Sequence, residues 1–204
     1  MADTTGPWET DTSPPPHICA RTLAGAFARE PAVSWICGSS AAVRHHWFTA
    51  VLTTQAALPG ARSYTLAGPG GRPAAAAVLT PPAATPPPAA RARWAARTLA
   101  RCGPRALGRT LRYLHSTGAR APGGAWTLEF IGVVPAATGR GAGRLLLDRV
   151  IADTPATAGI FLTTADPGNA TLYRHFGFGT LRRTTTGPLT VTAMHRPPAP
   201  PRAR

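Results

Sequence analysis

Trp126-Thr-Leu-Glu-Phe-Ile-Gly-Val-Val-Pro-Ala-Ala-Thr-Gly-Arg-Gly-Ala-Gly-Arg-Leu-Leu-Leu147 is the stretch that decides the fold of this 204-residue chain. Its first nine residues are rich in β-branched and aromatic side chains and stop at Pro135, which predicts a β-strand. Three glycines then stand on alternate positions, and apolar residues recur at helical spacing from Leu145 to Ile151. The segment therefore predicts a strand, a glycine loop and a helix in direct succession.

The glycine loop can hold an anion at the start of that helix. The first backbone N–H groups of a helix have no internal partner, and the helix dipole attracts negative charge. Gly139, Gly141 and Gly143 lack a Cβ, so phosphate oxygens can approach the main chain. Arg140 and Arg144 can add charge-assisted hydrogen bonds. The spacing matches neither the dinucleotide fingerprint nor a P-loop, and a turn that serves only tight packing is the alternative.

The remaining sequence predicts one mixed α/β domain at residues 17–196, without internal repeats. Residues 1–16 and 197–204 lack apolar periodicity, and we expect a disordered leader and a flexible tail. The predicted helices are 18–30, 40–58, a helical insert at 91–117 made of two Arg-rich patterns, and 169–176. The predicted strands are a hairpin at 63–67 and 74–79, then 159–164, 178–183 and 189–195, and residues 81–88 form a Pro-rich loop.

The formal charge of the chain is +14. All 22 basic residues are Arg, scattered among abundant Ala, Gly and Pro, which is typical of GC-rich coding, so we do not expect nucleic acid as the main partner. No apolar run approaches the ~20 residues that span a bilayer, and the first residues lack a signal-peptide pattern. Cys19, Cys37 and Cys102 lie far apart, so we expect buried thiols in a reduced, cytoplasmic protein without a metal site.

A second segment, Leu162-Thr-Thr-Ala-Asp-Pro-Gly-Asn-Ala-Thr-Leu-Tyr-Arg-His-Phe-Gly-Phe178, places Asn169 four residues before Tyr173 and ends in Gly-Phe. In this order and spacing, the two segments resemble the acetyl-CoA-binding motif and the second motif of GNAT-superfamily N-acetyltransferases. The long helical insert before the central strand is most similar to the puromycin N-acetyltransferase-like branch. The resemblance implies a mixed, largely antiparallel sheet, splayed at its centre by the cofactor and flanked by helices.

The resemblance also implies which main-chain groups bind acetyl-CoA. The pantetheine is expected to pair, strand-like, with Ile131 to Val133, and the backbone N–H of Val133 is the expected donor to the oxyanion. The pyrophosphate is expected on the backbone N–H groups from Arg140 to Arg144, in a cofactor-binding loop made of Thr138, Gly139, Arg140, Gly141, Ala142, Gly143 and Arg144. Thr138 departs from the family, which usually carries Gln or Arg at this position. Its shorter side chain can offer less to the phosphates.

Two side chains of the second segment receive roles from the same resemblance. Tyr173 is expected to protonate the departing thiolate, because a phenol of pKa ~10 is only modestly less acidic than a thiol of ~8.5. Asn169 is expected to fix the pantetheine arm or an ordered water. A Tyr that is only packed, with a satisfied hydroxyl, and an Asn that only caps a helix are the structural alternatives.

Glu129 interrupts the apolar strand and is its only carboxylate. Strict alternation of side chains predicts that it shares a face with Thr127, Ile131 and Val133, opposite Phe130. A carboxylate among apolar residues is costly unless it is paired or hydrated. Glu129 is therefore a candidate catalytic base for the amine, directly or through water, and a salt bridge to an Arg is the alternative.

The expected function is transfer of acetyl from acetyl-CoA to a primary amine of a small molecule by direct attack, without an acyl-enzyme. A protein or peptide N-acetyltransferase shares these motifs and differs in an open groove. A non-catalytic acyl-CoA-binding or nucleic-acid-binding module is the other alternative. The scarcity of acidic residues argues against a polycationic acceptor. A homodimer is compatible with this assignment.

Overall fold

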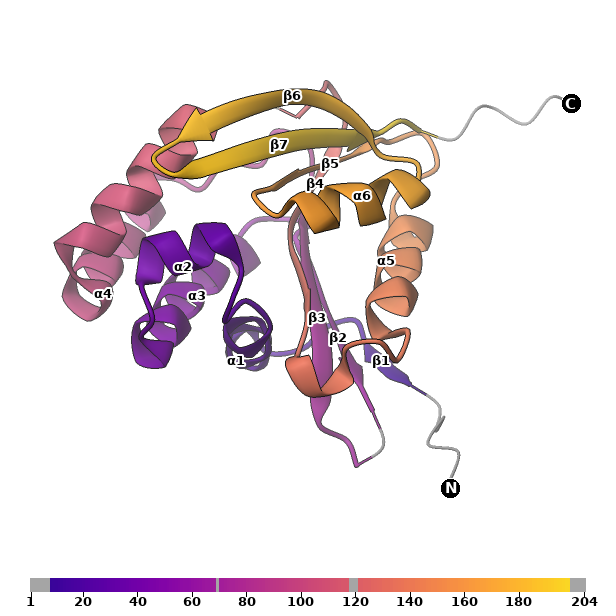
Figure 1. Ribbon diagram of the computed structural model, residues 1–204, viewed down its shortest axis with the longest axis horizontal. Coiled ribbons are helices and arrows are strands. Elements are labelled where there is room, and N and C mark those ends of the chain that lie inside the picture. Colours follow the sequence, from indigo (N-terminus) through magenta and orange to yellow (C-terminus); the bar gives the residue numbers. More distant parts are fainter. Residues whose placement is uncertain (1–7, 69, 118–120, 199–204) are drawn as a thin grey trace, which may run out of the picture.

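The computed structural model describes residues 8–68, 70–117 and 121–198, in which helices surround a seven-stranded sheet (Figure 1). The strands are β1 (Glu9–Asp11), β2 (Arg62–Ala67), β3 (Pro73–Thr80), β4 (Trp126–Val133), β5 (Ile160–Thr164), β6 (Gly179–Thr186) and β7 (Leu189–Arg196). The helices are α1 (Pro16–Ala26), α2 (Pro31–Cys37), α3 (Ala41–Ala56), α4 (Pro88–Thr117), the 3₁₀ turn η1 (Pro135–Ala137), α5 (Ala142–Asp153) and α6 (Pro167–His175).

The sheet has the strand order β1-β2-β3-β4-β5-β7-β6, and its pairs are antiparallel except for β4 with β5. That parallel pair is short: Trp126 pairs with Ile160 and Thr127 pairs with Phe161, and beyond them the two strands separate. Figure 1 shows the consequence, with β2, β3 and β4 running in a different direction from the layer of β5, β6 and β7. The predicted fold class, a largely antiparallel sheet splayed at its centre and flanked by helices, is confirmed.

Helices cover both faces of the β2–β4 half of the sheet (Figure 1). On one face, Ala77 and Leu79 of β3 pack in the same core cluster as Leu146 of α5. On the other face, Val78 packs in a cluster with Phe48 of α3. Because β3 is buried on both faces, its sequence is apolar at consecutive positions rather than alternating. The central strands are thereby fixed between two cores.

Several predicted elements match the structure. The first predicted helix ends earlier than expected, and one helix was not predicted. The hairpin and the helices around residues 40–58 and 169–176 are present. Helix α1 ends at Ala26, and α2, which the sequence pattern did not reveal, begins at Pro31. Pro31 is tolerated there because a proline at the first helical position loses no hydrogen bond, and the Glu30 side chain caps the helix by accepting from Val33 N. Pro31 thus starts a helix rather than ending one.

The ends of the predicted domain also differ from expectation. Residues 9–11, assigned to a disordered leader, form β1 and pair antiparallel with β2, and α1 begins at Pro16. The edge strand could not be recognised because Glu-Thr-Asp carries no apolar pattern. Residues 1–7 and 199–204 of the predicted leader and tail, with Pro69 in the turn of the hairpin, lie outside the described residues.

The helical insert forms α4, which is interrupted at Gly103 by a positive φ of 83°, just before Pro104. The two predicted Arg-rich helical patterns therefore correspond to the two arms of α4. Residues 81–87, in the predicted Pro-rich loop, contain no regular secondary structure and connect β3 to this helix. Loop and insert together lie on the α1–α3 side of the sheet (Figure 1).

Candidate active site

The glycine loop has the geometry that the sequence predicts. Gly139 and Gly141 both have a φ of 79°, and a Cβ at either position would meet nothing within 4 Å. Glycine is needed at these two positions for backbone conformation, because a side chain is strained at positive φ. Gly143 serves packing instead: a Cβ there would come within 3.2 Å of Val133 Cγ2. The loop therefore brings the start of α5 directly against β4.

The start of α5 presents free backbone donors. The first hydrogen bond of the helix runs from Leu145 N to Gly141 O at 3.0 Å, so the N–H groups before it point out of the helix end. Arg140 N, by contrast, already donates to Ala137 O at 3.4 Å, which shortens the predicted run of donors by one. Arg144 is exposed and lies 3.8 Å from Asp148. The loop therefore has the main-chain donors that an anion site requires, with exposed cationic side chains beside it.

The second main-chain feature is the edge of β4 that faces the gap in the sheet. Val134 N donates to Ala74 O at 2.8 Å on the β3 side. Backbone groups alternate sides along a strand, so those of Ile131 and Val133 point away from β3, where β5 has already separated. An extended chain such as pantetheine fits an unpaired strand edge. These residues therefore suit acetyl-CoA as the sequence resemblance implies.

A β-bulge at Glu129 changes the predicted orientation of β4. Val78 pairs with Phe130 while Leu79 pairs with Leu128, so Glu129 is an extra residue without a partner on β3. Downstream of the bulge, Ile131 packs with the core cluster on the α5 side, and Phe130 with the cluster on the α1–α3 side. The extra residue thus shifts the alternation by one position.

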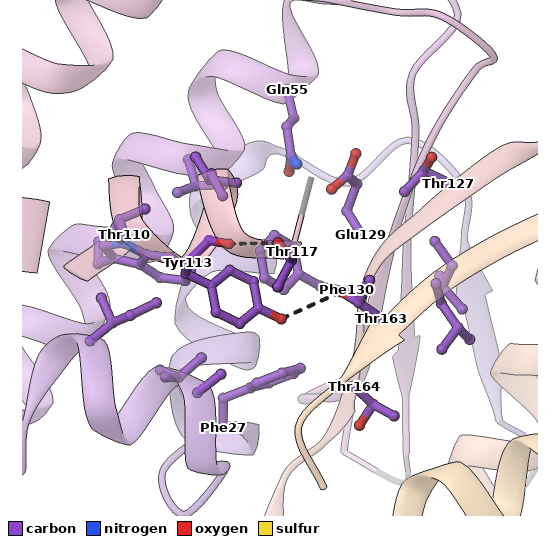
Figure 2. Close-up of a pocket in the computed structure, with 18 of the residues that line it drawn as sticks. Phe27, Gln55, Thr110, Tyr113, Thr117, Thr127, Glu129, Phe130, Thr163 and Thr164 are labelled. Atoms are coloured by element: carbon purple, nitrogen blue, oxygen red, sulfur yellow. Dashed lines mark hydrogen bonds between the residues drawn. The ribbon is translucent and has the colours of Figure 1, made fainter. Parts of the chain in front are cut away.

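Glu129 consequently lies on the α3 side, and the predicted face shared with Ile131 and Val133 is wrong. Its Oε1 accepts a 2.7 Å hydrogen bond from Thr80 Oγ1 at the end of β3. In Figure 2 Glu129 and Gln55 of α3 point toward one another. Strict alternation failed because a bulge depends on the register of the neighbouring strand, which β4 alone does not encode.

The environment of Glu129 makes its carboxylate a stronger base than an exposed one. Burial raises the pKa of its carboxyl, and hydrogen bonding from Thr80 and Gln55 opposes part of this rise. Within the described part of the chain, the salt bridges are Arg144–Asp148 and Arg149–Asp153. None involves Glu129, so the salt-bridge alternative finds no partner among these residues.

Helix α6 carries the two residues of the second motif. Asp166 caps this helix by accepting from Gly168 N at 2.8 Å, so the alternative of Asn169 as the N-cap is wrong. Tyr173 is buried, with its ring 5.7 Å from that of Phe178. Burial, followed by the nearby carboxylates of Glu30 and Asp166, raises the pKa of Tyr173 above its ordinary value. Its hydroxyl makes no hydrogen bond within the described residues, which disfavours a purely structural role.

Glu129, Asn169 and Tyr173 line one cavity of about 800 Å³, and Figure 2 shows Glu129 among the residues around it. The part of β4 from Thr127 to Ile131 and the strand β5 form one wall. Helices α3 and α4, with Ala84 and Pro86 of the loop before α4, form the opposite side. The structure thus brings the predicted chemical residues together and places the phosphate-type loop elsewhere, at the start of α5.

Three cavity residues escaped sequence reasoning. Gln55 of α3 lies beside Glu129, and Glu30 lines the cavity while it caps α2. Trp94 of α4 also lines the cavity. All three come from the N-terminal half, where no motif spans them. Helical spacing could have placed Trp94 and Gln55 on the inward faces of their helices. The same spacing is found for core residues, so it does not distinguish a pocket from a core.

The cysteines and other candidate chemistry do not add a second site. Cys19 and Cys37 are buried, as predicted, and burial raises their pKa values to about 11 and about 12, respectively. Thiols with such pKa values are poor nucleophiles at neutral pH. Across residues 8–68, 70–117 and 121–198 there is no group of three or more His, Cys, Asp or Glu side chains that could hold a metal ion. In the same residues no helix is both long and apolar enough to cross a membrane.

No protein-family model matches the sequence, and no curated protein matches it significantly. Solved structures do match. A histone acetyltransferase HPA2-related acetyltransferase from Corynebacterium glutamicum has a TM-score of 0.72 at 20% identity, covering 96% of this chain and 99% of that chain. Polyamine N-acetyltransferase from Drosophila melanogaster, which forms N-acetylagmatine, has a TM-score of 0.58 at 14% identity, covering 92% and 99%.

A third similar structure is the ribosomal-protein-S18-alanine N-acetyltransferase of Escherichia coli, with a TM-score of 0.55 at 16% identity, covering 97% of this chain and 99% of that chain. Two of these three similar proteins are named for protein substrates and one for small amines. At such low identities, the similarity establishes a fold rather than a substrate. The chain has the fold of the GNAT acetyltransferases along nearly its whole length.

Proposed function

We propose that the protein is an acetyl-CoA-dependent N-acetyltransferase that acetylates a primary amine of a small molecule. The observation that carries the proposal is that one strand, β4, offers a backbone edge for the cofactor and a carboxylate for the acceptor. Its free backbone edge at Ile131 and Val133 leads to the anion site at α5, while its bulge points Glu129 into a cavity. A cofactor and an acceptor can therefore meet across one strand, in a fold common to acetyltransferases.

The main chain is proposed to hold acetyl-CoA. The residues are Ile131 and Val133 for the pantetheine, Asn169 beside them, and Thr138, Gly139, Arg140, Gly141, Ala142, Gly143 and Arg144 for the pyrophosphate. Acetyl-CoA supplies an activated acetyl group as a thioester. Backbone N–H groups at a helix start bind phosphate without needing a particular side chain, which is consistent with the short Thr138 in this loop.

The side chains supply the proton transfers. An amine attacks only when neutral, so a bound ammonium must first lose a proton. The raised pKa of the Glu129 carboxyl suits it to take this proton, directly or through one water. The Val133 N–H points into the gap and is proposed to stabilise negative charge on the carbonyl oxygen. The raised pKa keeps Tyr173 protonated at neutral pH, so its hydroxyl can give a proton to the departing sulfur. An ammonium loses two protons in all: the one taken by Glu129 before attack is released to solvent, and the one that nitrogen loses after attack replaces the proton that Tyr173 gives to the thiolate, which balances the transfer.

The cavity favours a small acceptor over a protein. A protein substrate needs an open groove for its chain. Here the loop at residues 81–87 and helix α4 contribute a wall opposite β4, so the space at Glu129 is surrounded from several elements. The puromycin N-acetyltransferase-like branch, a cytoplasmic location and a homodimer stay predictions, as does the absence of nucleic acid as the main partner.

Two measurements test the proposed function. A thermal-shift titration with acetyl-CoA should raise the melting temperature, because a ligand that binds only the folded state stabilises it. A thiol-release assay with a library of primary amines should show turnover. Absence of both binding and turnover rejects the proposal. Binding without turnover, unchanged in Tyr173→Phe, indicates instead a non-catalytic acyl-CoA-binding module.

A further inference from the structure

The cavity contains an unpaired acceptor beside Glu129. The Oε1 atom of Gln55 is buried and, among the described residues, has no hydrogen-bond partner. A buried carbonyl oxygen without a donor is costly. Glu129 also keeps acceptor capacity, because Thr80 Oγ1, at 2.7 Å from Oε1, and the Gln55 side chain are its partners, whereas a carboxylate offers about four lone-pair sites. Two acceptors at one point of the cavity suit a donor-rich group such as an ammonium.

The charge balance of the cavity limits the number of cations to one. Glu30 and Glu129 are the two carboxylates among the described lining residues. Glu30 is already engaged, since its Oε2 accepts from Val33 N at 2.7 Å and caps α2. Arg91, which is exposed, also lines the cavity and brings positive charge. A second cation on the same molecule would have only the Glu30 carboxylate, which already caps α2, and would be repelled by Arg91.

Aromatic side chains form part of the rest of the cavity wall, among aliphatic and threonine side chains. Trp94, Tyr113 and Phe130 line it. The polar atoms of nearby rings are used within the protein: Trp47 Nε1 donates to Thr110 Oγ1 at 2.9 Å, and the Tyr113 hydroxyl lies 3.4 Å from Thr163 Oγ1 (Figure 2). Ring faces with satisfied polar atoms favour an aromatic ligand through burial and stacking.

We propose that the acceptor is an aromatic monoamine. Its ammonium binds Gln55 Oε1 together with Glu129, and its aromatic body packs against Trp94 and Tyr113. Gln55 is thereby a substrate-binding residue. This inference rests on the proposed function and makes it more specific, because the amine is held next to the group that removes its proton.

The test compares two primary amines in the thiol-release assay with the full-length protein. 2-Phenylethylamine is the aromatic monocation, and agmatine is the aliphatic dication. We expect kcat/KM for 2-phenylethylamine to exceed that for agmatine by about tenfold or more, since a substrate that forgoes one hydrogen bond or one stacked ring in the cavity reacts about ten times less efficiently. A preference for agmatine overturns the inference and leaves the proposed acetyl transfer intact.

Two variants locate the binding groups. Gln55→Leu keeps the volume but removes the acceptor, and we expect KM for 2-phenylethylamine to rise about tenfold with kcat less affected. Trp94→Ala should reduce the preference for 2-phenylethylamine over propylamine. Leu99→Ala is the control, because Leu99 is exposed on α4 and outside the cavity lining. An unchanged KM in Gln55→Leu and an unchanged preference in Trp94→Ala contradict the assigned binding groups.

A binding measurement separates this inference from the proposed function. Quenching of tryptophan fluorescence by 2-phenylethylamine is recorded in the presence of CoA, which requires no turnover. Saturable quenching that weakens in Gln55→Leu supports the aromatic-amine site even if no acetylation occurs. Absence of saturable binding of 2-phenylethylamine overturns this inference, whereas the proposed function is rejected only when acetyl-CoA binding and turnover with the amine library are absent as well.

Discussion

The two halves of the site are built in different ways. The cofactor half, β4 with the glycine loop and α5, offers main-chain groups: the free edge at Ile131 and Val133 and the N–H groups before Leu145. The acceptor half, α3 with the loop at residues 81–87 and α4, offers side chains such as Gln55 and Trp94. Main-chain sites need a contiguous motif, whereas side-chain pockets assemble residues that lie far apart in the sequence. The first kind can be recognised from sequence, and the second kind only from structure.

Strand β4 connects the two halves because of a single extra residue. The bulge directs Glu129 toward the acceptor half while Ile131 and Val133 keep facing the α5 side. Without the bulge, one strand would present its carboxylate and its apolar side chains to the same layer. We therefore expect the largest effects where the two halves meet, and smaller effects within the loop.

The largest effect is expected from Glu129→Gln. Gln keeps the size of the side chain and can still accept from Thr80, so the fold should be retained, but it cannot take a proton. We expect kcat/KM at neutral pH to fall about 10³-fold, within the range of general base catalysis. The thiol-release assay measures this loss, with melting temperature as the check on folding. Glu9→Gln, on the exposed edge strand β1, is the matched control.

The pH dependence of kcat/KM tests whether Glu129 is the base. The raised pKa of Glu129 means that the base is lost as pH falls through a value above the ordinary ~4.3 of glutamate. The acidic limb of kcat/KM should therefore lie above that value in the wild type and be absent in Glu129→Gln. A limb that stays in the variant would assign it to another group and remove Glu129 as the base.

The next largest effect is expected from Tyr173→Phe. The ring and its packing against Phe178 are kept, and only the hydroxyl is removed. We expect kcat to fall about 10²-fold with little change in acetyl-CoA affinity, because the proton is needed only as the thiolate leaves. Tyr64→Phe, outside the cavity, is the control. Because burial raises the pKa of Tyr173, any loss of activity from its ionisation must occur above the ordinary ~10. A variant with unchanged kcat would leave Tyr173 a packing residue.

The sequence predicted the geometry of the glycine loop well for physical reasons. Gly139 and Gly141 have positive φ, and Gly143 packs closely against β4. Only glycine meets these requirements without cost, so the glycines predict the conformation of the loop. Helix α3 is similarly marked by Ser40, whose side chain accepts from Val43 N at 3.3 Å. In each case the signal and the structure lie within a few residues of one another.

The features that sequence missed depend on distant partners. The bulge at Glu129 is defined by the register of Val78 and Leu79 on β3. The unpaired Oε1 of Gln55 exists only because α3 packs beside the bulge. Strand β1 is an edge strand specified by its pairing with β2 rather than by its own side chains. None of these is a local property of the chain.

Within the cofactor half, Gly141→Ala should give a moderate effect. Alanine at a φ of 79° costs about 1–2 kcal/mol, and a free loop can relieve that strain by rearranging. Binding must then restore the phosphate geometry, so we expect acetyl-CoA to bind about tenfold more weakly by isothermal titration. Gly71→Ala has a φ of 70° in the hairpin turn and likewise meets nothing within 4 Å, so it should cost similar stability without affecting binding. Equal losses of acetyl-CoA affinity in Gly141→Ala and Gly71→Ala would show that backbone strain weakens binding by lowering the stability of the whole protein.

The smallest effect is expected from Thr138→Gln, which restores a side chain common in the resembling family. Thr138 is exposed, and its Oγ1 lies 3.5 Å from Val134 O, at the limit of a hydrogen bond. The longer amide can reach toward a phosphate that the hydroxyl cannot, but main-chain donors already supply most of the binding. We expect the Kd for acetyl-CoA to fall by about two- to fivefold with kcat unchanged. Thr138→Ser, which removes only the methyl group and keeps the hydroxyl, should leave Kd unchanged. If Thr138→Gln instead weakens binding, the phosphates lie on a different part of the loop, and the division between main-chain cofactor half and side-chain acceptor half has to be redrawn there.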